Sequence, residues 1–201
     1  MQYEIFRDVL VIVISVTAVL GAIIGGMIFF LLRTALIKDI TTEVNKHLDK
    51  ACRKLSGQTD VQAGVTYWLR GMYDYAISNT ERALSDAGDV LDEKQIIFAK
   101  SNLGYYYAEK HKRQSTWHLK ESAIALTKIG FEKYSPTITD FKQPDWIDNY
   151  AFARAIFAQT ASEGEEIIEL IDSLLLRTDL TTIHAYLEES KQYILGSELT
   201  S

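Results

Sequence analysis

Hydrophobic and polar positions divide the chain into one uninterrupted apolar run and a longer part in which apolar residues recur at helical spacing. The apolar run covers residues 9–32, where 24 consecutive residues carry no charge. At ~1.5 Å per helical residue the run reaches roughly 36 Å, which exceeds the ~30 Å hydrocarbon thickness of a bilayer. The pattern therefore predicts a single transmembrane helix over residues 9–32, preceded by a short N-terminal segment, residues 1–8.

A cleaved signal peptide is the first alternative for this run. Such a peptide has a basic start, a shorter apolar stretch and a small-residue cleavage site. Here Glu4, Arg7 and Asp8 precede the run and no such cleavage site follows it. A buried core helix does not suit the length of the run. We therefore expect a retained membrane anchor.

Positive charges near the ends of the span predict its orientation, because cytoplasmic flanks are richer in Lys and Arg. Arg7 alone precedes the span, whereas four basic residues follow it within 18 positions: Arg33, Lys38, Lys46 and Lys50. We expect a single-pass membrane protein whose C-terminal domain is cytoplasmic. The bias is modest, since acidic residues are interleaved among these four, and the lone Cys52 is consistent with a reducing compartment.

Small residues form a ridge along the predicted span: Ala18, Gly21, Ala22, Gly25 and Gly26. Small residues let two helix backbones approach closely in lipid, so the ridge predicts lateral association, for example as a homodimer. Glycine is also frequent in membrane helices that do not associate, and this alternative stays open.

Residues 33–57 are expected to form a juxtamembrane amphipathic helix that ends at Gly57. Its apolar residues recur at steps of three and four: Ile37, Ile40, Val44, Leu48, Ala51 and Leu55. This stripe favours packing against the following domain. A short two-stranded coiled coil is the alternative, although the stripe lasts fewer than three heptads.

The rest of the chain has helix-end signals and no sustained strand alternation. Asp92 with Gln95 forms a capping-box pattern, and Gly130 and Gly196 stand where C-terminal caps are expected. The expected fold is all-α. Its soluble part comprises two helical hairpins over residues 58–133, a loop over 134–144, and a third hairpin with a capping helix over 145–201.

An internal repeat supports the hairpins. Gly64 and Gly104 are 40 residues apart, and so are Ala83 and Ala123. A glycine inside a helix costs about 0.5–1 kcal/mol relative to alanine, so each glycine is expected to mark a close crossing of two helices.

The first hairpin resembles a tetratricopeptide (TPR) repeat at eight positions: Gly64, Tyr67, Gly71, Tyr73, Ala76, Ile77, Ala83 and Leu84. The second matches less well, with His111 at the turn glycine, Arg113 at the aromatic that opens helix B, and Thr116 at the helix-B alanine. The turn "EKHKRQ" is expected to be longer and more solvated than usual. The third hairpin lacks the signature. The apolar stripe Leu180, Ile183, Leu187 and Ile194 is expected to cap the resulting α-solenoid.

The resemblance implies a partner-binding groove lined by the first helix of each repeat. By position, its residues are Val61, Val65, Trp68, Leu69, Phe98, Asn102 and Tyr105. An apolar, aromatic groove suits a helix or hydrophobic segment of a protein partner. The family's carboxylate clamp needs Lys, Arg and Asn, and only Asn102 is of the right type. The open alternative is that the juxtamembrane or C-terminal helix covers Trp68 and Tyr105.

Charge and motifs exclude several function classes. The formal net charge is −6, and residues 136–201 hold 12 acidic against 4 basic residues, a balance of −8. Nucleic-acid binding requires a basic stripe instead. The four histidines form no HExxH pattern, and neither a G-x-S-x-G elbow nor a phosphate-binding glycine loop is present. We expect no cofactor, no metal and no enzymatic activity.

The predicted function is that of a membrane-anchored TPR-like scaffold or adaptor, which docks a protein or peptide partner as part of a larger assembly. The alternative is a signal-transmitting or receptor-type subunit whose transmembrane helix dimerises. A hydrolase using His118 or His184 is a third, weaker option.

Overall fold

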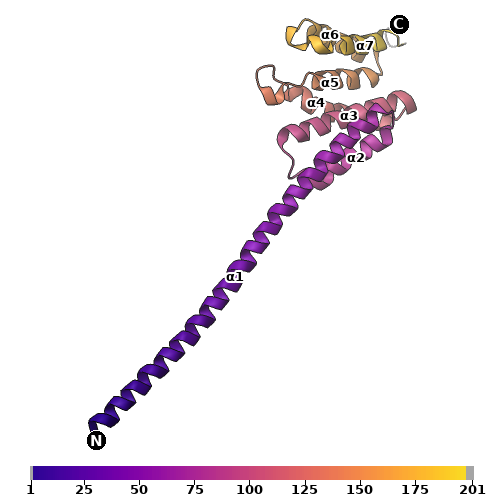
Figure 1. The fold of residues 1–201 in the computed structure, drawn as a ribbon. Coiled ribbons are helices and arrows are strands. Elements are labelled where there is room, and N and C mark those ends of the chain that lie inside the picture. Colours follow the sequence, from indigo (N-terminus) through magenta and orange to yellow (C-terminus); the bar gives the residue numbers. More distant parts are fainter. Residues whose placement is uncertain (1, 198–201) are drawn as a thin grey trace. The chain divides into compact units, whose positions relative to one another are not determined.

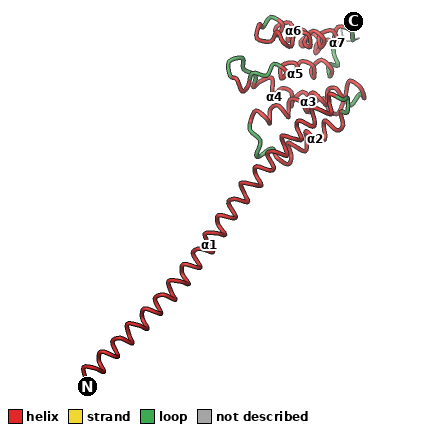
Figure 2. The backbone as a smooth tube through the Cα atoms, in the orientation of Figure 1, coloured by secondary structure: helices red, strands yellow, loops and turns green. Residues whose placement is uncertain are grey.

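The computed structural model describes residues 2–197 and divides the chain into two units, with the boundary between Ala51 and Cys52. Within the described residues every regular element is helical, and no strand is present (Figures 1 and 2). The all-α prediction is confirmed for this part of the chain. The α-helices are α1 (Gln2–Leu69), α2 (Tyr73–Ala87), α3 (Glu93–Gln114), α4 (Lys120–Lys133), α5 (Asp145–Ile156), α6 (Ala161–Leu175) and α7 (His184–Leu195). Short 3₁₀ helices lie at Trp117–Leu119, Thr139–Phe141 and Thr178–Ile183.

The first unit consists of the N-terminal part of α1. Among the described residues this is the one helix long and apolar enough to cross a membrane, and none of its most apolar window is buried. The stripe residues from Ile37 to Ala51 are also exposed in this unit.

The predicted helix end at Gly57 is wrong, because α1 continues without a break to Leu69. Gly57 has a packing role instead. A Cβ atom built on it would lie 2.5 Å from the Cβ of Ala87 and 3.4 Å from Leu91 Cδ2. The glycine therefore lets the end of α2 approach α1 closely, and the amphipathic segment and the first hairpin share one helix.

The last turns of α1 and helix α2 form the predicted antiparallel hairpin. The chain reverses at Gly71, whose φ of +71° lies in the left-handed region that favours glycine. Gly71 N donates to the carbonyl of Trp68 at 2.8 Å. A Cβ on Gly64 would meet the Thr80 hydroxyl and would lie 3.2 Å from the carbonyl oxygen of Ala76. The predicted crossing of Gly64 and Ala76 is confirmed.

Helices α3 and α4 repeat this crossing with different spacing. A Cβ on Gly104 would lie 2.7 Å from the carbonyl oxygen of Ala123 and 2.7 Å from Thr127 Cγ2. Ala123 and Thr127 thus take the places of Ala76 and Thr80. They do so at an offset of 47 residues, whereas the two glycines are 40 apart. The seven extra residues amount to about two helical turns.

Those two turns extend α3, so the prediction of a solvated turn at "EKHKRQ" is wrong. Thr116 does not face Gly104, and Ala83 and Ala123 do not hold equivalent places. The extension is held by His111, which is buried, stacks on Phe157 with ring centroids 4.4 Å apart, and meets Trp117 at 4.2 Å. Burial lowers the pKa of His111.

Of the three other predicted helix ends, two are confirmed and one is wrong. Asp92 and Gln95 form the capping box at the start of α3, and Gly196 follows the last residue of α7. Gly130 does not end α4, which runs on to Lys133. A Cβ on Gly130 would lie 2.9 Å from the Cβ of Trp146, so this glycine also marks a close approach, here between α4 and α5.

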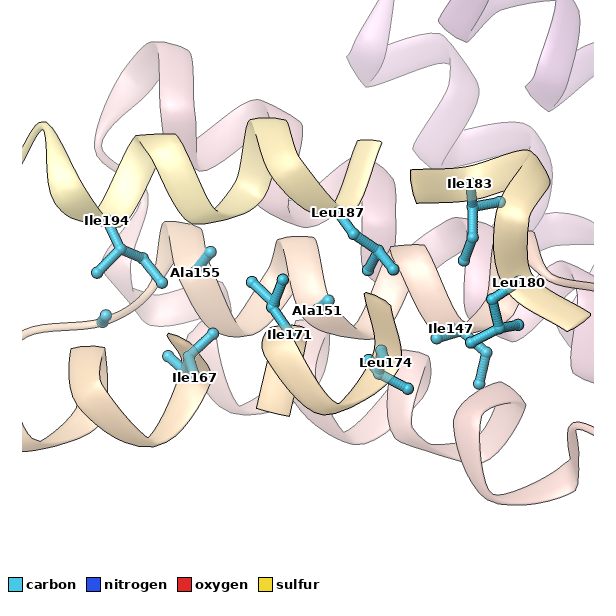
Figure 3. Packing of buried hydrophobic residues seen from close by; sticks show 11 residues of the cluster. Ile147, Ala151, Ala155, Ile167, Ile171, Leu174, Leu180, Ile183, Leu187 and Ile194 are labelled. Carbon is cyan, nitrogen blue, oxygen red and sulfur yellow. The ribbon is translucent and has the colours of Figure 1, made fainter. Parts of the chain in front are cut away.

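Helix α5 packs on both α3 and α4, and α6 and α7 then cover it (Figure 1). Figure 3 shows the cluster at this end, where Ile147, Ala151 and Ala155 of α5 face apolar residues of α6 and α7. The predicted stripe of Leu180, Ile183, Leu187 and Ile194 is buried there, each residue at most 2% exposed. The stripe begins in the 3₁₀ helix Thr178–Ile183 rather than in a single α-helix.

Candidate functional site

Two neighbouring cavities lie along the second unit, lined mainly by α1, α3 and α5. The first has a volume of about 410 Å³ and is called here the amide cavity, because Gln58, Gln62, Gln95 and Gln143 line it with Val61, Phe98 and Trp146. The second has a volume of about 290 Å³ and is called the aromatic cavity. Its walls include Phe98, Trp68, Tyr105, Tyr106 and Tyr186, together with Asp145 and Asp148. Phe98 lines both cavities, so the two adjoin, and together they are called the α1–α3–α5 groove.

Six of the seven predicted groove residues line these cavities. Val65, Trp68, Asn102 and Tyr105 lie in the aromatic cavity, Val61 in the amide cavity, and Phe98 in both. Leu69 lines neither and is 70% exposed at the end of α1.

Helical spacing explains why these residues meet. Val61, Val65 and Trp68 follow one another on α1 at steps of four and three, and so do Phe98, Asn102 and Tyr105 on α3. Side chains at this spacing lie on one face of a helix. Helix α5 contributes the third wall through Asp145, Asp148 and Asn149, where Asp148 and Asn149 follow Asp145 by three and four residues and so lie on its face of the helix.

The aromatic rings of the second cavity contact one another. Trp68 meets Tyr105 edge to face with ring centroids 5.6 Å apart, and lies 6.3 Å from Tyr106 in a stacked arrangement. The Tyr105 hydroxyl donates to Glu109 Oε1 at 3.3 Å, and burial raises the Tyr105 pKa. The cavity therefore has rigid aromatic walls and a phenol that stays protonated.

A buried polar link joins two of the helices beneath the cavity. Asn149 Nδ2 donates to Ser101 Oγ at 3.0 Å and to Asn102 Oδ1 at 3.4 Å. Because Asn149 and Ser101 are both buried, this link fixes α5 against α3.

Asp148 has the most unusual surroundings in the groove. Its Oδ1 is buried, and none of the described residues gives it a hydrogen bond. Burial, together with the nearby carboxylates of Asp145 and Glu189, raises the pKa of Asp148 to about 7. Within residues 13–197, whose side chains the structure describes, no basic nitrogen lies within 4.0 Å of Asp145 or Asp148.

Sequence reasoning missed the acidic wall and the contribution of α7. Asp148 is a half-buried carboxylate in a helix whose buried residues are all uncharged, "WIDNYAFARAIFA", and this contrast was the available signal. The sequence contains no such signal for Tyr186, because this residue lines the cavity only as a result of the packing of α7 on α5.

The C-terminal helix supplies one wall of the aromatic cavity through Tyr186, which is itself 57% exposed. Trp68 and Tyr105 remain half-buried. The predicted alternative, in which α7 covers both aromatics, therefore applies only to one side of the cavity.

The small residues of the predicted membrane helix have quite different surroundings. Ala18 and Ala22 are exposed, and a Cβ built on Gly21, Gly25 or Gly26 would have nothing within 4 Å. In the described residues, no group of three or more His, Cys, Asp or Glu side chains could hold a metal ion.

The chain matches no protein-family model, no curated protein and no solved structure.

Proposed function

We propose that this chain is a membrane-anchored docking protein that holds a segment of a partner protein in the α1–α3–α5 groove. One observation supports this most strongly. Six residues predicted to contact a partner line two adjoining cavities that share Phe98. Concave, largely apolar surfaces with a few polar groups are typical binding sites in proteins.

The two cavities offer different contacts to such a segment. Four glutamine side chains in the amide cavity can pair with main-chain groups of a peptide. Trp146 also lines this cavity, and its indole nitrogen is buried without a hydrogen-bond partner among the described residues. The aromatic cavity suits a large side chain. A helix or extended segment that places one side chain in each cavity would use both sets of contacts.

The TPR resemblance is part of this proposal. The crossings of Gly64 with Ala76 and of Gly104 with Ala123 support hairpins of that type. In that architecture the first helix of each pair lines the binding face, and here α1, α3 and α5 hold that position.

The N-terminal helix would serve as the anchor. Confinement at a bilayer raises the effective concentration of partners held at the same surface without any new contact. The four basic residues after residue 32 favour a cytoplasmic location for the groove.

The signal-transmitting alternative has one observation in its favour. Gly21, Gly25 and Gly26 have no neighbours in the chain itself, as expected of positions that meet a second helix. In that case the groove would report a rearrangement of the dimer rather than only capture a partner.

Site-specific photocrosslinking in intact cells tests the docking proposal. A benzophenone residue replaces Phe98, where both cavities meet, and a matched control replaces Leu176, which is 85% exposed after α6. We expect the photocrosslinker at position 98 to capture one dominant partner protein, and the photocrosslinker at position 176 not to capture that protein. The same partner should no longer bind the purified full-length Asn102→Arg variant. A partner that crosslinks equally at both positions, or that binds this variant normally, contradicts the proposal.

A further inference from the structure

We propose that the aromatic cavity is a receptor for a basic side chain, so that the docked segment is recognised through one Lys or Arg inserted between Trp68, Tyr105 and Asp148. This inference rests on the docking function proposed above and names the chemistry of the partner.

The aromatic walls are the first support. Trp68, Tyr105 and Tyr106 have ring centroids within 5.6–6.4 Å of one another, and Phe98 and Tyr186 complete the lining. Aromatic faces attract Lys ammonium and Arg guanidinium groups, and the attraction is stronger when the site excludes water.

Two carboxylates without partners are the second support. Asp145 and Asp148 line the same cavity, and Asp148 Oδ1 accepts no hydrogen bond from the described residues. A buried charge is costly unless it is paired, so this side chain is placed where it gains most from an incoming cation.

The carboxylates next to the cavity, unlike Asp145 and Asp148, each lie near a basic side chain. Glu109 lies 3.8 Å from Arg113, and Glu189 lies 3.9 Å from Lys112. Among the described residues, basic side chains therefore pair with the carboxylates around the cavity and with neither of the two that line it. The raised pKa of Asp148 agrees with this, because a nearby cation would have lowered it.

The size of the cavity favours a side chain over a larger ligand. Its volume of about 290 Å³ lies at the lower end of pockets that hold whole small molecules, which run from roughly 300 to 1,000 Å³. A Lys or Arg side chain can enter it while the rest of the segment lies across Phe98 into the amide cavity.

A peptide selection tests this inference. The full-length chain in nanodiscs of neutral phosphatidylcholine is used to select from a phage library of random twelve-residue peptides, with empty nanodiscs as the background. Two variants are selected in parallel. Asp148→Asn removes the charge at nearly constant shape, and Asn102→Arg places a guanidinium inside the cavity. Thermal unfolding of both variants confirms that they are folded.

We expect Lys and Arg to be enriched at one position of the peptides that bind the wild type. For the best peptide, the dissociation constant should rise about tenfold with Asp148→Asn, the loss of one charged contact of about 1.4 kcal/mol. Replacing the enriched residue by norleucine should have the same effect on the wild type and little effect on Asp148→Asn.

The outcomes separate this inference from the docking function. If peptides bind the wild type but not Asn102→Arg, and show no enrichment of basic residues, docking stands and the cation site is refuted. Enrichment that persists unchanged with Asp148→Asn also refutes it. If wild type and Asn102→Arg select the same peptides, both proposals fail.

Discussion

Glycines in the two units of this chain have opposite surroundings. In the second unit, a Cβ on Gly57, Gly104 or Gly130 would come within 3 Å of another helix. In the first unit, the same atom on Gly21 or Gly25 would have nothing within 4 Å. Glycine costs about 0.5–1 kcal/mol inside a helix relative to alanine, so a helical glycine is a candidate for a close contact with another helix. The second unit supplies those contacts itself, and the first does not.

Asp148 in the second unit resembles Gly21 and Gly25 in one respect: contacts among the described residues do not offset the cost of having this residue at its position. Its burial is unfavourable, and the described residues give its Oδ1 no partner. Residues whose presence the chain's own packing does not explain are the natural candidates for contact with another molecule. The predictions below test this distinction.

The largest effect is expected at Gly104. The atoms around its missing side chain include the backbone carbonyl of Ala123 and the backbone nitrogen of Thr127, neither of which can move aside easily. Gly104→Ala should lower the free energy of unfolding by about 2–3 kcal/mol, the cost of overpacking a tight site. Chemical denaturation followed by circular dichroism measures this. An unchanged denaturation midpoint would show that the α3–α4 crossing is looser than described.

Asp148→Asn should change stability in a way that depends on pH. The folded-state pKa of about 7 lies above the unfolded value near 4, so the folded protein binds the extra proton between these values and loses stability as pH rises through 7. Replacing the carboxylate should stabilise the domain at pH 8 by about 1–2 kcal/mol, and by less at pH 5.

The control for this pH dependence is the wild-type protein itself. The lowered pKa of His111 acts in the opposite direction, removing stability as pH falls below about 6.5. His111 contributes equally to both proteins, so the difference between the two unfolding curves isolates Asp148. A variant that is less stable than the wild type at pH 8 would show that the carboxylate is satisfied within the chain.

A smaller effect is expected at Gly64. Its nearest neighbour is the hydroxyl of Thr80, with the carbonyl oxygen of Ala76 further away at 3.2 Å. Gly64→Ala should therefore cost about 1 kcal/mol. The double variant Gly64→Ala/Thr80→Ala should recover part of that loss, because the two positions are coupled. Strict additivity in a double-mutant cycle would place Thr80 out of contact with Gly64.

The smallest effect on the second unit is expected from Gly21→Leu/Gly25→Leu. A Cβ on either residue would have no atom of the described residues within 4 Å, so the free energy of unfolding of the helical domain should change by less than about 0.5 kcal/mol. Energy transfer between labelled copies in liposomes measures self-association. Its loss in the variant supports the signal-transmitting alternative, whereas unchanged transfer and unchanged partner binding favour simple anchoring.

The sequence predicted those features that depend on residues close together along the chain. The faces of α1 and α3 in the groove follow from steps of three and four, and the turn at Gly71 follows from one glycine. The position at which α3 ends could not be predicted in this way, because it depends on the packing of His111 against Phe157, which lies 46 residues further along the chain.

The acidic wall of the groove could not be predicted for the same reason. Asp148 lines the same cavity as Trp68 and Tyr105 only because α5 packs against α3 and α4, and Gly130 permits the close approach of α4 to Trp146 of α5. The prediction of a helix end at Gly57 is wrong because sequence alone does not distinguish a glycine that ends a helix from one that lets another helix approach.

The three tryptophans of the chain allow the most direct test of the groove. Trp68 lines the aromatic cavity, Trp146 lines the amide cavity, and Trp117 lines neither. In the full-length protein labelled with ¹⁵N-tryptophan, a peptide selected as above should shift the indole resonances of Trp68 and Trp146 to saturation at the same dissociation constant, while Trp117 stays in place. Saturable binding that leaves Trp68 and Trp146 unmoved, or that moves Trp117 as much, would contradict a docking groove along α1, α3 and α5.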